Sequence, residues 1–415
     1  MHLVRLTTLQ KLRSRFALSA SGFHSLLRRN ELPIEISLLT IGIAGMVARI
    51  ALAWVSEGSN DVIIWRQWGT LLQFHSLTDV YSNVERFNHP PLMAWWVASA
   101  LRWSQHGPLR FAVLLKLPGL LAEGVTCWLL WRIWRPTGRL LAAFAVAAFA
   151  WNLDSILVSG FHGSTDSVCA MLCLLSAAWI QQRAFFLGGL GLAAALNVKL
   201  IPLILVPTFL ILAPTWRQGI RFVSALALGA LPFLPFLVSA GSGFYAHAIA
   251  YNSNPDNWGV SFLLNAAEQN PRFAAITAGL AQIYRSGARY LILGICVVFG
   301  FWARWARWNS FRLSFLCLAV FLVFAPGFGV QYTVYVVPTL FAISLPQAVL
   351  YSWLSGFFIL GVYFNFALLN EYPLRSQFTT AYPPPASLLG LVAWTVLIVL
   401  LLRNLASHAE QPLHR

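Results

Sequence analysis

Twelve apolar segments run through this 415-residue chain, and short polar links separate them. A helix that crosses a bilayer needs about 20 apolar residues, and its backbone groups must pair with one another because lipid offers them no partners. The sequence therefore predicts an all-α polytopic membrane protein with about twelve transmembrane helices. The segments lie near residues 34–54, 109–133, 139–157, 166–182, 184–197, 199–213, 220–239, 286–303, 311–327, 332–347, 351–368 and 386–403.

The composition excludes a soluble globular domain. Hydrophobic residues make up 58% of the chain and charged residues 10%, whereas soluble domains carry about 25% charged residues. The net charge of +15 comes from Arg and Lys clusters between the apolar segments. Such spacing indicates membrane topology and argues against a nucleic-acid partner. The five cysteines form no CxxC pair and are interpreted as packing residues.

The basic clusters also predict the orientation of the chain. With the N-terminus in the cytoplasm, nearly every second link carries the Arg and Lys residues that the positive-inside rule expects there. The chain then divides into a basic cytoplasmic segment (1–33), an integral membrane domain (34–403) and a cytoplasmic tail (404–415). The larger extracytoplasmic loops are 55–108 and 240–285, and most of the candidate chemistry lies on their side of the membrane.

Some apolar stretches differ from simple spans. Residues 90–103 are apolar and aromatic but too short to cross, which predicts an interfacial helix on the outer leaflet. The segments around Lys199 and around Tyr332 and Pro338 are interpreted as re-entrant or cavity-lining, since irregular backbone at membrane depth must be buried in protein. These segments are therefore not expected to face lipid.

Asp61 is the main candidate for catalysis. It lies early in the first outer loop, after Asn60 and ahead of several aromatic residues. A single well-placed carboxylate can take a proton from an acceptor hydroxyl as a general base. The alternative is a helix N-cap, because Ser59, Asn60 and Asp61 all favour that position. His89, farther along the same loop, is a candidate substrate-binding residue.

A second polar group lies where two apolar segments meet. His162 and Asp166 are in a short link, and Asp154 just before it is expected within the bilayer near the outer edge. Ionisable residues at that depth are costly, so all three are candidates for substrate binding. The alternatives are that Asp166 caps its helix and that Asp154 pairs with a local donor.

Basic residues near the outer face are candidates for binding a phosphate. Lys116 is seven residues from Glu123, a candidate substrate ligand, so the two share a helical face; alternatively they pair with each other inside the bundle. Lys199 interrupts an apolar run and either binds an anion or snorkels to the interface. Arginine suits bidentate phosphate contact, although snorkelling anchors are the commoner use. The candidates are Arg110, Lys116, Lys199, Arg272 and Arg285.

The motifs argue against several cofactors. The histidines and outer carboxylates form no HxxxH or HExxH pattern, so no metal site is predicted. The sequence also has no Walker loop, no Gly-rich dinucleotide fingerprint and no soluble domain that could hold a nucleotide. An activated donor is therefore expected to be lipid-borne.

The order of these motifs resembles that of the C-type glycosyltransferases (GT-C) that use polyprenyl-phosphate sugars. The resemblance covers most of the chain by order. After the basic N-terminus and first span come Asp61, Asn-His-Pro-Pro-Leu at 88–92, the Lys116 to Glu123 segment, His-Gly-Ser-Thr-Asp-Ser at 162–167, Asn-Val-Lys-Leu-Ile-Pro at 197–202, and a late motif at 326–332 that includes Gln331 and Tyr332.

This resemblance implies an inverting transfer in which Asp61 is the catalytic base and a lipid phosphate leaves the anomeric carbon. The Pro-Pro-Leu form is closest to the branches that transfer mannose or glucose to lipid-linked glycans. Gln331 and Tyr332 then become substrate-binding candidates. Two departures stand out: Asn60 replaces one of a pair of acidic residues, which argues against a divalent metal, and Glu123 stands where an Asp is more usual.

Three classes of function are therefore open. The leading one is a hexosyltransferase acting on lipid-linked or cell-envelope acceptors at the extracytoplasmic face of a bacterial plasma membrane. The second is a secondary transporter or lipid flippase, in which Lys116, Glu123 and Asp154 would form a path near the midplane. A non-catalytic scaffold would leave these charges unexplained. The length and aromatic content of loop 55–108 favour the enzyme.

Overall fold

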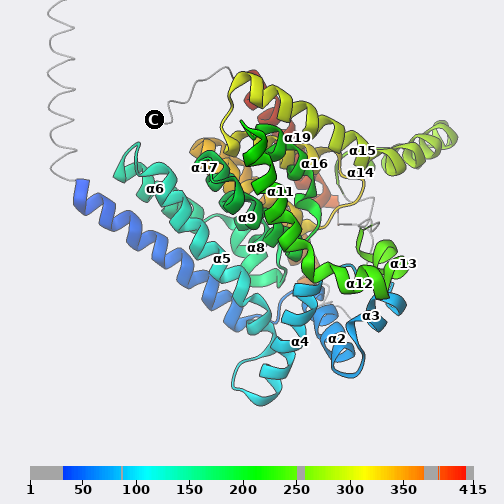
Figure 1. The fold of residues 1–415 in the computed structure, drawn as a ribbon. Helices are drawn as coiled ribbons and strands as arrows, with labels where there is room; N and C mark the ends of the chain where they lie inside the picture. The colour runs from blue at the N-terminus through cyan, green and yellow to red at the C-terminus, as the bar shows by residue number, and fades with distance from the viewer. Residues whose placement is uncertain (1–30, 86, 250–257, 369–381, 383, 408–415) are drawn as a thin grey trace, which may run out of the picture.

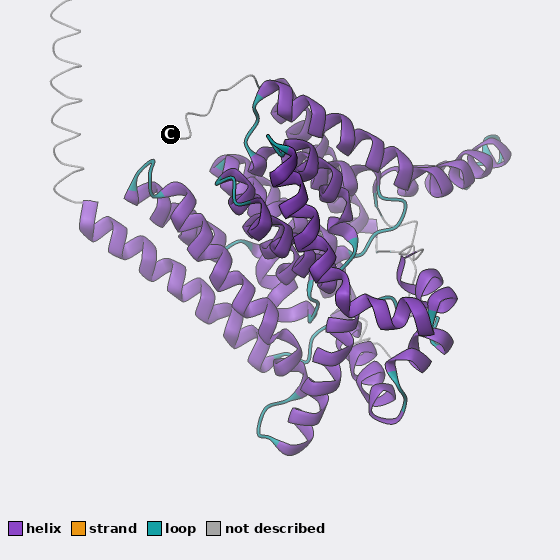
Figure 2. Cartoon of the chain, in the orientation of Figure 1, coloured by secondary structure: helices purple, strands orange, loops and turns teal. Residues whose placement is uncertain are grey.

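The described part of the chain is all-helical. The computed structural model describes residues 31–85, 87–249, 258–368, 382 and 384–407. Helices joined by loops account for all of these residues, and none of them is in a strand (Figure 2). The predicted all-α class is confirmed for this part of the chain. Most of segment 1–33, part of loop 240–285 and most of tail 404–415 lie outside the described residues.

Within the described residues, six helices are long and apolar enough to cross a membrane. A seventh crossing results if α6 and the helix that follows it, which are bent by 48° to each other, count as one span. The six are Glu31–Val55, α5 (Phe111–Trp134), Trp216–Ser239 (α11, Trp216–Ala230, with α12, Leu234–Ser239), α15 (Ala274–Ala306), Leu345–Phe364 within α18 (Leu345–Leu368), and α19 (Pro384–Ala406). The bent pair is α6 (Arg139–Ala150) followed by Leu153–His162.

The other predicted spans are helical but short. Each has fewer than 18 residues, so the predicted count of twelve spans is not confirmed. Their apolar character reflects burial among other helices, because a fully buried helix is as hydrophobic as one that faces lipid. They are α8 (Asp166–Gln181), α9 (Phe185–Val198), Ile201–Leu212 ending in α10 (Leu205–Leu212), α16 (Ser310–Phe324) and Val330–Ile343 ending in α17 (Val337–Ile343).

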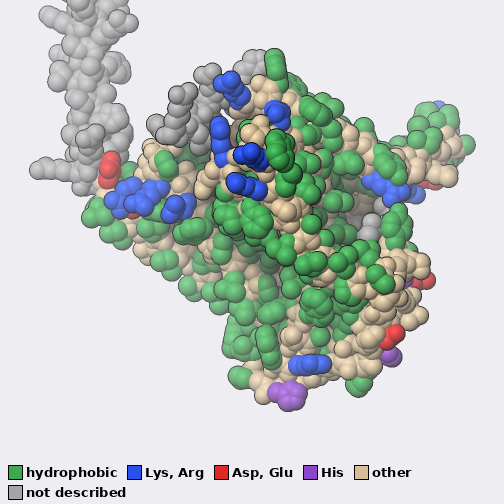
Figure 3. Space-filling view, viewed as in Figure 1, with side chains coloured by type: hydrophobic (Ala, Val, Ile, Leu, Met, Phe, Trp, Pro, Cys, Tyr) green, Lys and Arg blue, Asp and Glu red, His purple; other side chains and the backbone are tan. Residues whose placement is uncertain are grey.

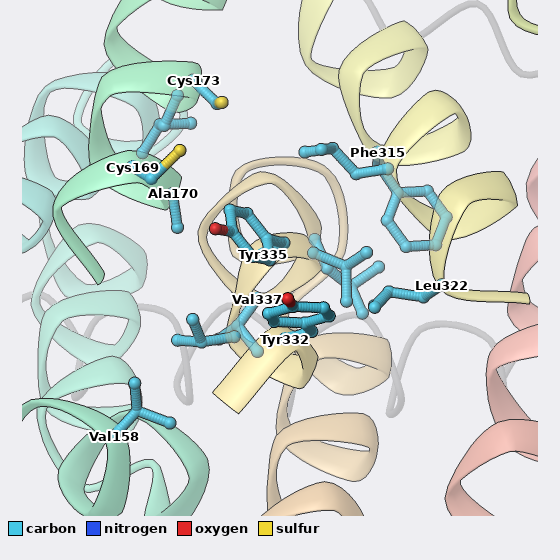
Figure 4. Packing of buried hydrophobic residues seen from close by; sticks show 14 of the residues in the cluster. Val158, Cys169, Ala170, Cys173, Phe315, Leu322, Tyr332, Tyr335 and Val337 are labelled. Carbon is cyan, nitrogen blue, oxygen red and sulfur yellow. The ribbon is translucent and has the colours of Figure 1, made fainter. Parts of the chain in front are cut away.

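The core lies around three of these short helices. Nearly every residue of α16 and of the segment from Val330 through α17 is buried. Figure 4 shows this segment between α8, which carries Cys169 and Cys173, and α16, which carries Phe315 and Leu322. Tyr332 and Tyr335 thereby enter the centre of the bundle.

Small residues allow helices to approach closely at the edge of the bundle. A Cβ added to Gly45 would lie 2.7 Å from the carbonyl oxygen of Ala150, so the helix Glu31–Val55 packs backbone to backbone against α6. Figure 1 shows this helix, in dark blue, along the outside of the bundle. Its remaining surface exposes many large apolar side chains, as expected of a helix that faces lipid.

Loop 55–108 folds into three helices at one end of the bundle. They are α2 (Asn60–Phe74), α3 (Leu77–Asn83) and α4 (Pro91–His106), with α12 and the short α13 (Gly241–Phe244) beside them (Figure 1). Helix α4 is the segment predicted to be interfacial, and Pro91 begins it. Figure 3 shows most of the visible Lys and Arg side chains toward the opposite end of the molecule. A second hydrophobic cluster joins the helices of loop 55–108 to α12 and α13. Its buried residues are Val80, Tyr81, Phe87, Ala94, Phe236, Ala240 and Phe244.

Candidate active site

Helix α2 begins against the link between two apolar helices. Ser59 is its N-cap: the Oγ atom accepts a hydrogen bond from the Asp61 N–H at 3.2 Å and donates one to the His162 carbonyl at 2.7 Å. Capping is therefore done by Ser59, which leaves the Asp61 carboxylate for other contacts. Asp61 lies in the first turn of α2, where the helix dipole stabilises negative charge.

The Asp61 carboxylate begins a chain of three polar side chains. Its Oδ2 lies 3.0 Å from Nε2 of His162, and Nδ1 of the same ring is hydrogen-bonded to the Tyr363 hydroxyl. With Asp61 ionised, Nε2–H donates to the carboxylate, so in the neutral imidazole Nδ1 accepts from Tyr363. The side chain of His162 is 5% exposed and that of Asp61 is 31% exposed. Asp61 is thus the accessible end of a buried chain.

The charges around Asp61 favour its ionised form. Burial alone would raise the pKa of the Asp61 carboxyl, but the contact and hydrogen bond with the His162 ring, together with the charge of Lys199, hold this pKa below its ordinary value. For His89, burial and the charge of Lys199 outweigh the opposing effect of Asp61 and lower the pKa to about 3. His89 is therefore neutral at physiological pH, and its ring packs against Trp65 with centroids 4.2 Å apart.

Two glycines permit the close approach of α2 to the His162 link. Gly58 has φ +103° and Gly163 has φ +81°, backbone conformations that other residues adopt only at a cost. A Cβ on Gly58 would lie 2.7 Å from the Phe161 carbonyl oxygen, and one on Gly163 would overlap Val62 Cγ2. The local sequence thus brings together two segments that are about a hundred residues apart.

A second group, on the other side of the link, centres on Asp166. Lys199 Nζ lies 2.7 Å from its Oδ1, and the Tyr335 hydroxyl donates to the same oxygen at 2.7 Å. Lys199 also lies over the ring of Tyr332, 4.7 Å from the centroid. The Asp166 side chain is completely buried and its Oδ2 has no hydrogen-bond partner among the described residues. Lys199 and Asp166 therefore form an ion pair in which the carboxylate is buried and the lysine side chain is 15% exposed.

Two of the predicted phosphate ligands contact the loop before α2. Lys116 Nζ donates to the Ser56 carbonyl and to its Oγ, both at 2.9 Å. Arg110 pairs with Glu57 at 2.8 Å on the surface. The pairing of Lys116 with Glu123, considered from their spacing, is not among these contacts. Lys116 and Arg110 thus each have a partner in the loop that precedes α2.

Glu123 and Asp154 lie deeper and are almost completely buried. One oxygen of Glu123 and both of Asp154 lack a hydrogen bond within the described residues. Asp154 lies near the hydroxyls of Ser355 and Thr333, whose protons go to backbone carbonyls. Neither carboxylate contacts Asp61 directly, so neither is part of its immediate surroundings.

Arg49 is a buried cation that the sequence analysis did not identify. Arg49 is completely buried in the first apolar helix, and its Nη2 donates to the Phe149 carbonyl at 2.8 Å and to Ser155 Oγ at 3.1 Å. It thus holds the bend after α6. An arginine inside an apolar segment was the available signal, since charged residues at that depth are functional or structural by default.

A group of aromatic residues includes Tyr332, which lies beside Lys199 and near the Phe328 ring. Tyr382 is electrostatically coupled to both Asp61 and Tyr332, and burial together with these charges raises the pKa of its hydroxyl. Trp258 stacks on Phe328, with centroids 4.4 Å apart and ring planes 8° apart. Partly exposed Gln331 follows in the same loop. Tyr332 of the late motif thus lies next to Lys199. Sequence reasoning gave no signal for Tyr335, Tyr363 or Tyr382.

The late arginines, Arg272 and Arg285, are both exposed. Arg272 is exposed in the turn between α14 (Gly259–Glu268) and α15, which projects away from the bundle (Figure 1). Arg285 is exposed on α15 next to Tyr284, whose hydroxyl donates to the Phe324 carbonyl at 2.7 Å. Among the described residues, no three His, Cys, Asp or Glu side chains are grouped closely enough to hold a metal ion.

Comparison with known proteins gives one clear relationship. Residues 87–326 match glycosyltransferase family 87, a stretch that includes His89, the Lys116 segment, His162, Asp166 and Lys199. Asp61, Tyr332 and Tyr363 lie outside the matched stretch. No curated protein matches the sequence. Because the match covers more than half of a chain with an all-helical fold and several apolar helices of spanning length, the chain belongs to glycosyltransferase family 87, a GT-C-type family.

Proposed function

We propose that this protein is an inverting glycosyltransferase that moves a hexose, mannose or glucose, from a polyprenyl-phosphate donor to a lipid-linked or cell-envelope acceptor. Family membership supports the transferase activity. The main structural support for the proposed reaction centre is the carboxylate of Asp61. It is partly exposed, and its Oδ2 lies 3.0 Å from Nε2 of the buried His162. A general base needs this combination of access to substrate and fixed orientation.

In the proposed reaction the acceptor hydroxyl attacks the anomeric carbon from the face opposite the phosphate. The new C–O bond forms while the bond to the lipid phosphate breaks, the phosphate keeps the electron pair, and Asp61 accepts the hydroxyl proton. A single displacement inverts the anomeric configuration. His162 and Tyr363 are positioning residues in this scheme, because they orient the carboxylate without touching the substrate.

Lys199 is the best supported cation for the leaving phosphate. Its charge lowers the pKa of Asp61, it remains partly exposed, and the face of Tyr332 lies beside it. A fixed cation in a site of low dielectric stabilises negative charge that develops during the reaction. Lys116 and Arg110 have a supporting role in the proposal, because they hold the loop from which α2 begins.

The donor is proposed to be lipid-borne because the described chain is helical throughout and offers no βαβ unit for a sugar nucleotide. The basic end of the molecule would face the cytoplasm of a bacterial cell, and α2 to α4 the opposite side of the plasma membrane. Loop 55–108 would then be the extracytoplasmic site. The family match favours this reaction over a secondary transporter or flippase.

The direct test uses purified protein in nanodiscs with labelled polyprenyl-phosphate mannose or glucose and a lipid extract as acceptor. Replacing the base, Asp61→Asn, is expected to lower the transfer rate by about 10²–10⁴-fold. The matched control is Asp79→Asn, which changes another carboxylate of the same outer loop, one that accepts from the Ser76 amide and hydroxyl in the capping box of α3. This control should keep its transfer activity. Full activity of Asp61→Asn would remove Asp61 from the mechanism.

A further inference from the structure

Two cavities adjoin at the end of the molecule opposite Asp61. One, of about 580 Å³, is a mainly apolar groove between α10 and α11, with walls that include Leu210, Ile220 and Val223. The other, also about 580 Å³, is a pocket at the ends of α8 and α15. The two share Pro214 and Arg304 in their walls, so the apolar groove continues into the pocket.

The pocket is strongly basic. Arg183, Arg304 and Arg307 all line it, and no Asp or Glu is among its lining residues. One guanidinium nitrogen of Arg304 donates to the carbonyls of Ile211 and Ala213, at 2.7 and 2.9 Å, which holds this arginine at the junction of groove and pocket. The positive-inside rule accounts for arginines in these links, but it does not require three of them to converge on one cavity.

Two of the three arginines have an unusual backbone. Arg183 has φ +60° and Arg307 has φ +53°, and they are the non-glycine residues with positive φ in the described chain. Each lies just after a helix, and the backbone N–H of the next residue donates a hydrogen bond to a carbonyl of that helix. The Ala184 N–H donates to the Trp179 carbonyl, and the Trp308 N–H donates to the Ala303 carbonyl. Glycine is the usual residue at this position. Arginine here carries a backbone cost, which points to a use for its side chain.

We propose that the groove and pocket form a binding site for an anionic phospholipid. The phosphate would lie among Arg183, Arg304 and Arg307, and an acyl chain would follow the apolar groove past Leu210 and Val223. The exposed apolar walls match a hydrocarbon chain, and three cations without a neighbouring carboxylate match a phosphate. Neither cavity alone would suit both parts of such a ligand.

This lipid site is separate from the candidate active site. Helix α8 has Asp166 at one end and leads to Gln181, in the pocket wall, at the other. Fifteen residues of helix at 1.5 Å each correspond to about 22 Å. The proposal therefore does not depend on the sugar-transfer reaction, and the two can fail independently.

The glycine preference of the two turns supplies a suitable variant. The double substitution Arg183→Gly and Arg307→Gly removes two charges from the pocket while giving each turn the residue that its φ favours, so the fold should be kept. The control, Arg132→Gln with Arg135→Gln, removes the same charge from exposed arginines at the end of α5, neither of which lines either cavity.

The measurement is the lipid retained by purified protein, by native mass spectrometry, after reconstitution in nanodiscs of equal parts phosphatidylglycerol and phosphatidylcholine. The unchanged protein and the control are expected to retain phosphatidylglycerol selectively, and the glycine variant to retain at least tenfold less. Equal retention by the glycine variant and the control would overturn the proposal, as would equal retention of the two lipids by the unchanged protein.

A competition arm separates a lipid from a soluble anion. Inorganic phosphate at the same concentration as a short-chain phosphatidylglycerol should not displace the retained lipid, because it lacks the chain that fills the groove. Displacement by phosphate as effective as that by the short-chain lipid would mean that the pocket takes soluble phosphate, and the lipid assignment would be wrong.

Discussion

Ser59 and His162 are joined twice through the His162 carbonyl, which accepts from the Ser59 hydroxyl at 2.7 Å and lies 3.4 Å from the Ser59 amide. The side chain of His162 then meets Asp61, two residues after Ser59. Backbone and side-chain contacts thus connect the same two segments, so the position of the proposed base depends on the link that carries His162.

Replacing His162 should separate positioning from folding. The variant His162→Gln removes the imidazole between Asp61 and Tyr363, and Tyr363→Phe removes only the hydroxyl bonded to Nδ1. We expect kcat to fall in both, more in His162→Gln, with KM changed less, because orientation matters most in the transition state. Steady-state transfer assays give both constants. If KM alone changed, His162 would be a substrate ligand and not a positioning residue.

Gly163 should tolerate no side chain. Gly163→Ala combines positive φ with an overlap against Val62 Cγ2, so we expect a loss of stability of about 1–3 kcal/mol. Adding Val62→Ala should recover part of this loss, since the overlap is removed and the backbone cost remains. The control is Gly287→Ala in α15, where nothing lies within 4 Å. Thermal unfolding in detergent measures all three, and a neutral Gly163→Ala would contradict the close approach.

The pH dependence follows from the lowered pKa of Asp61. A base with a depressed pKa stays ionised until the pH falls below about 3.9, the ordinary value for Asp. Asp61 should therefore cause no loss of kcat/KM between pH 5 and pH 7. By linkage, its contribution to stability is present above the unfolded pKa and is lost as the pH falls through the folded pKa. The stability difference between the unchanged protein and Asp61→Asn should accordingly shrink below about pH 4.

The buried pair of Lys199 and Asp166 allows a double-mutant test. Lys199→Met leaves a completely buried carboxylate without its cation, and we expect a loss of about 3–5 kcal/mol. Lys199→Met with Asp166→Asn should regain much of that stability, because no lone charge remains. If Lys199 also stabilises the leaving phosphate, transfer activity should stay low in the refolded double variant. Recovery of activity together with stability would assign Lys199 a structural role alone.

Hydrophobicity predicted where the helices are, but not how many cross the membrane. Each of the twelve apolar segments contains helix, yet helices such as α16 are apolar because other helices cover them on every side. A linear pattern reports the polarity of the surroundings and does not distinguish lipid from protein. The polar link before Asp166 was visible in the sequence, whereas the bend after Ala150 interrupts a segment that was predicted to continue to residue 157.

The candidate site was predicted in its parts but not in its pairings. Asp61 and His162 were each recognisable as ionisable groups near an outer loop. Their contact depends on Gly58 and Gly163, whose role appears only when α2 packs against the link. Lys116 was assigned to phosphate because an isolated lysine looks available, whereas the fold supplies the Ser56 carbonyl as its partner. Tyr363 had no local signal, since a tyrosine in an apolar helix is ordinary.

The twofold attachment of Ser59 to the His162 carbonyl has a mechanical consequence. Helix α2 cannot swing outward without drawing that carbonyl along or breaking both bonds, so the proposed base and His162 move as one unit. Entry of the lipid-borne donor that we propose would then require movement elsewhere, for example of the segment that carries Tyr332 beside Lys199. Cross-linking that segment, rather than α2, should therefore block transfer.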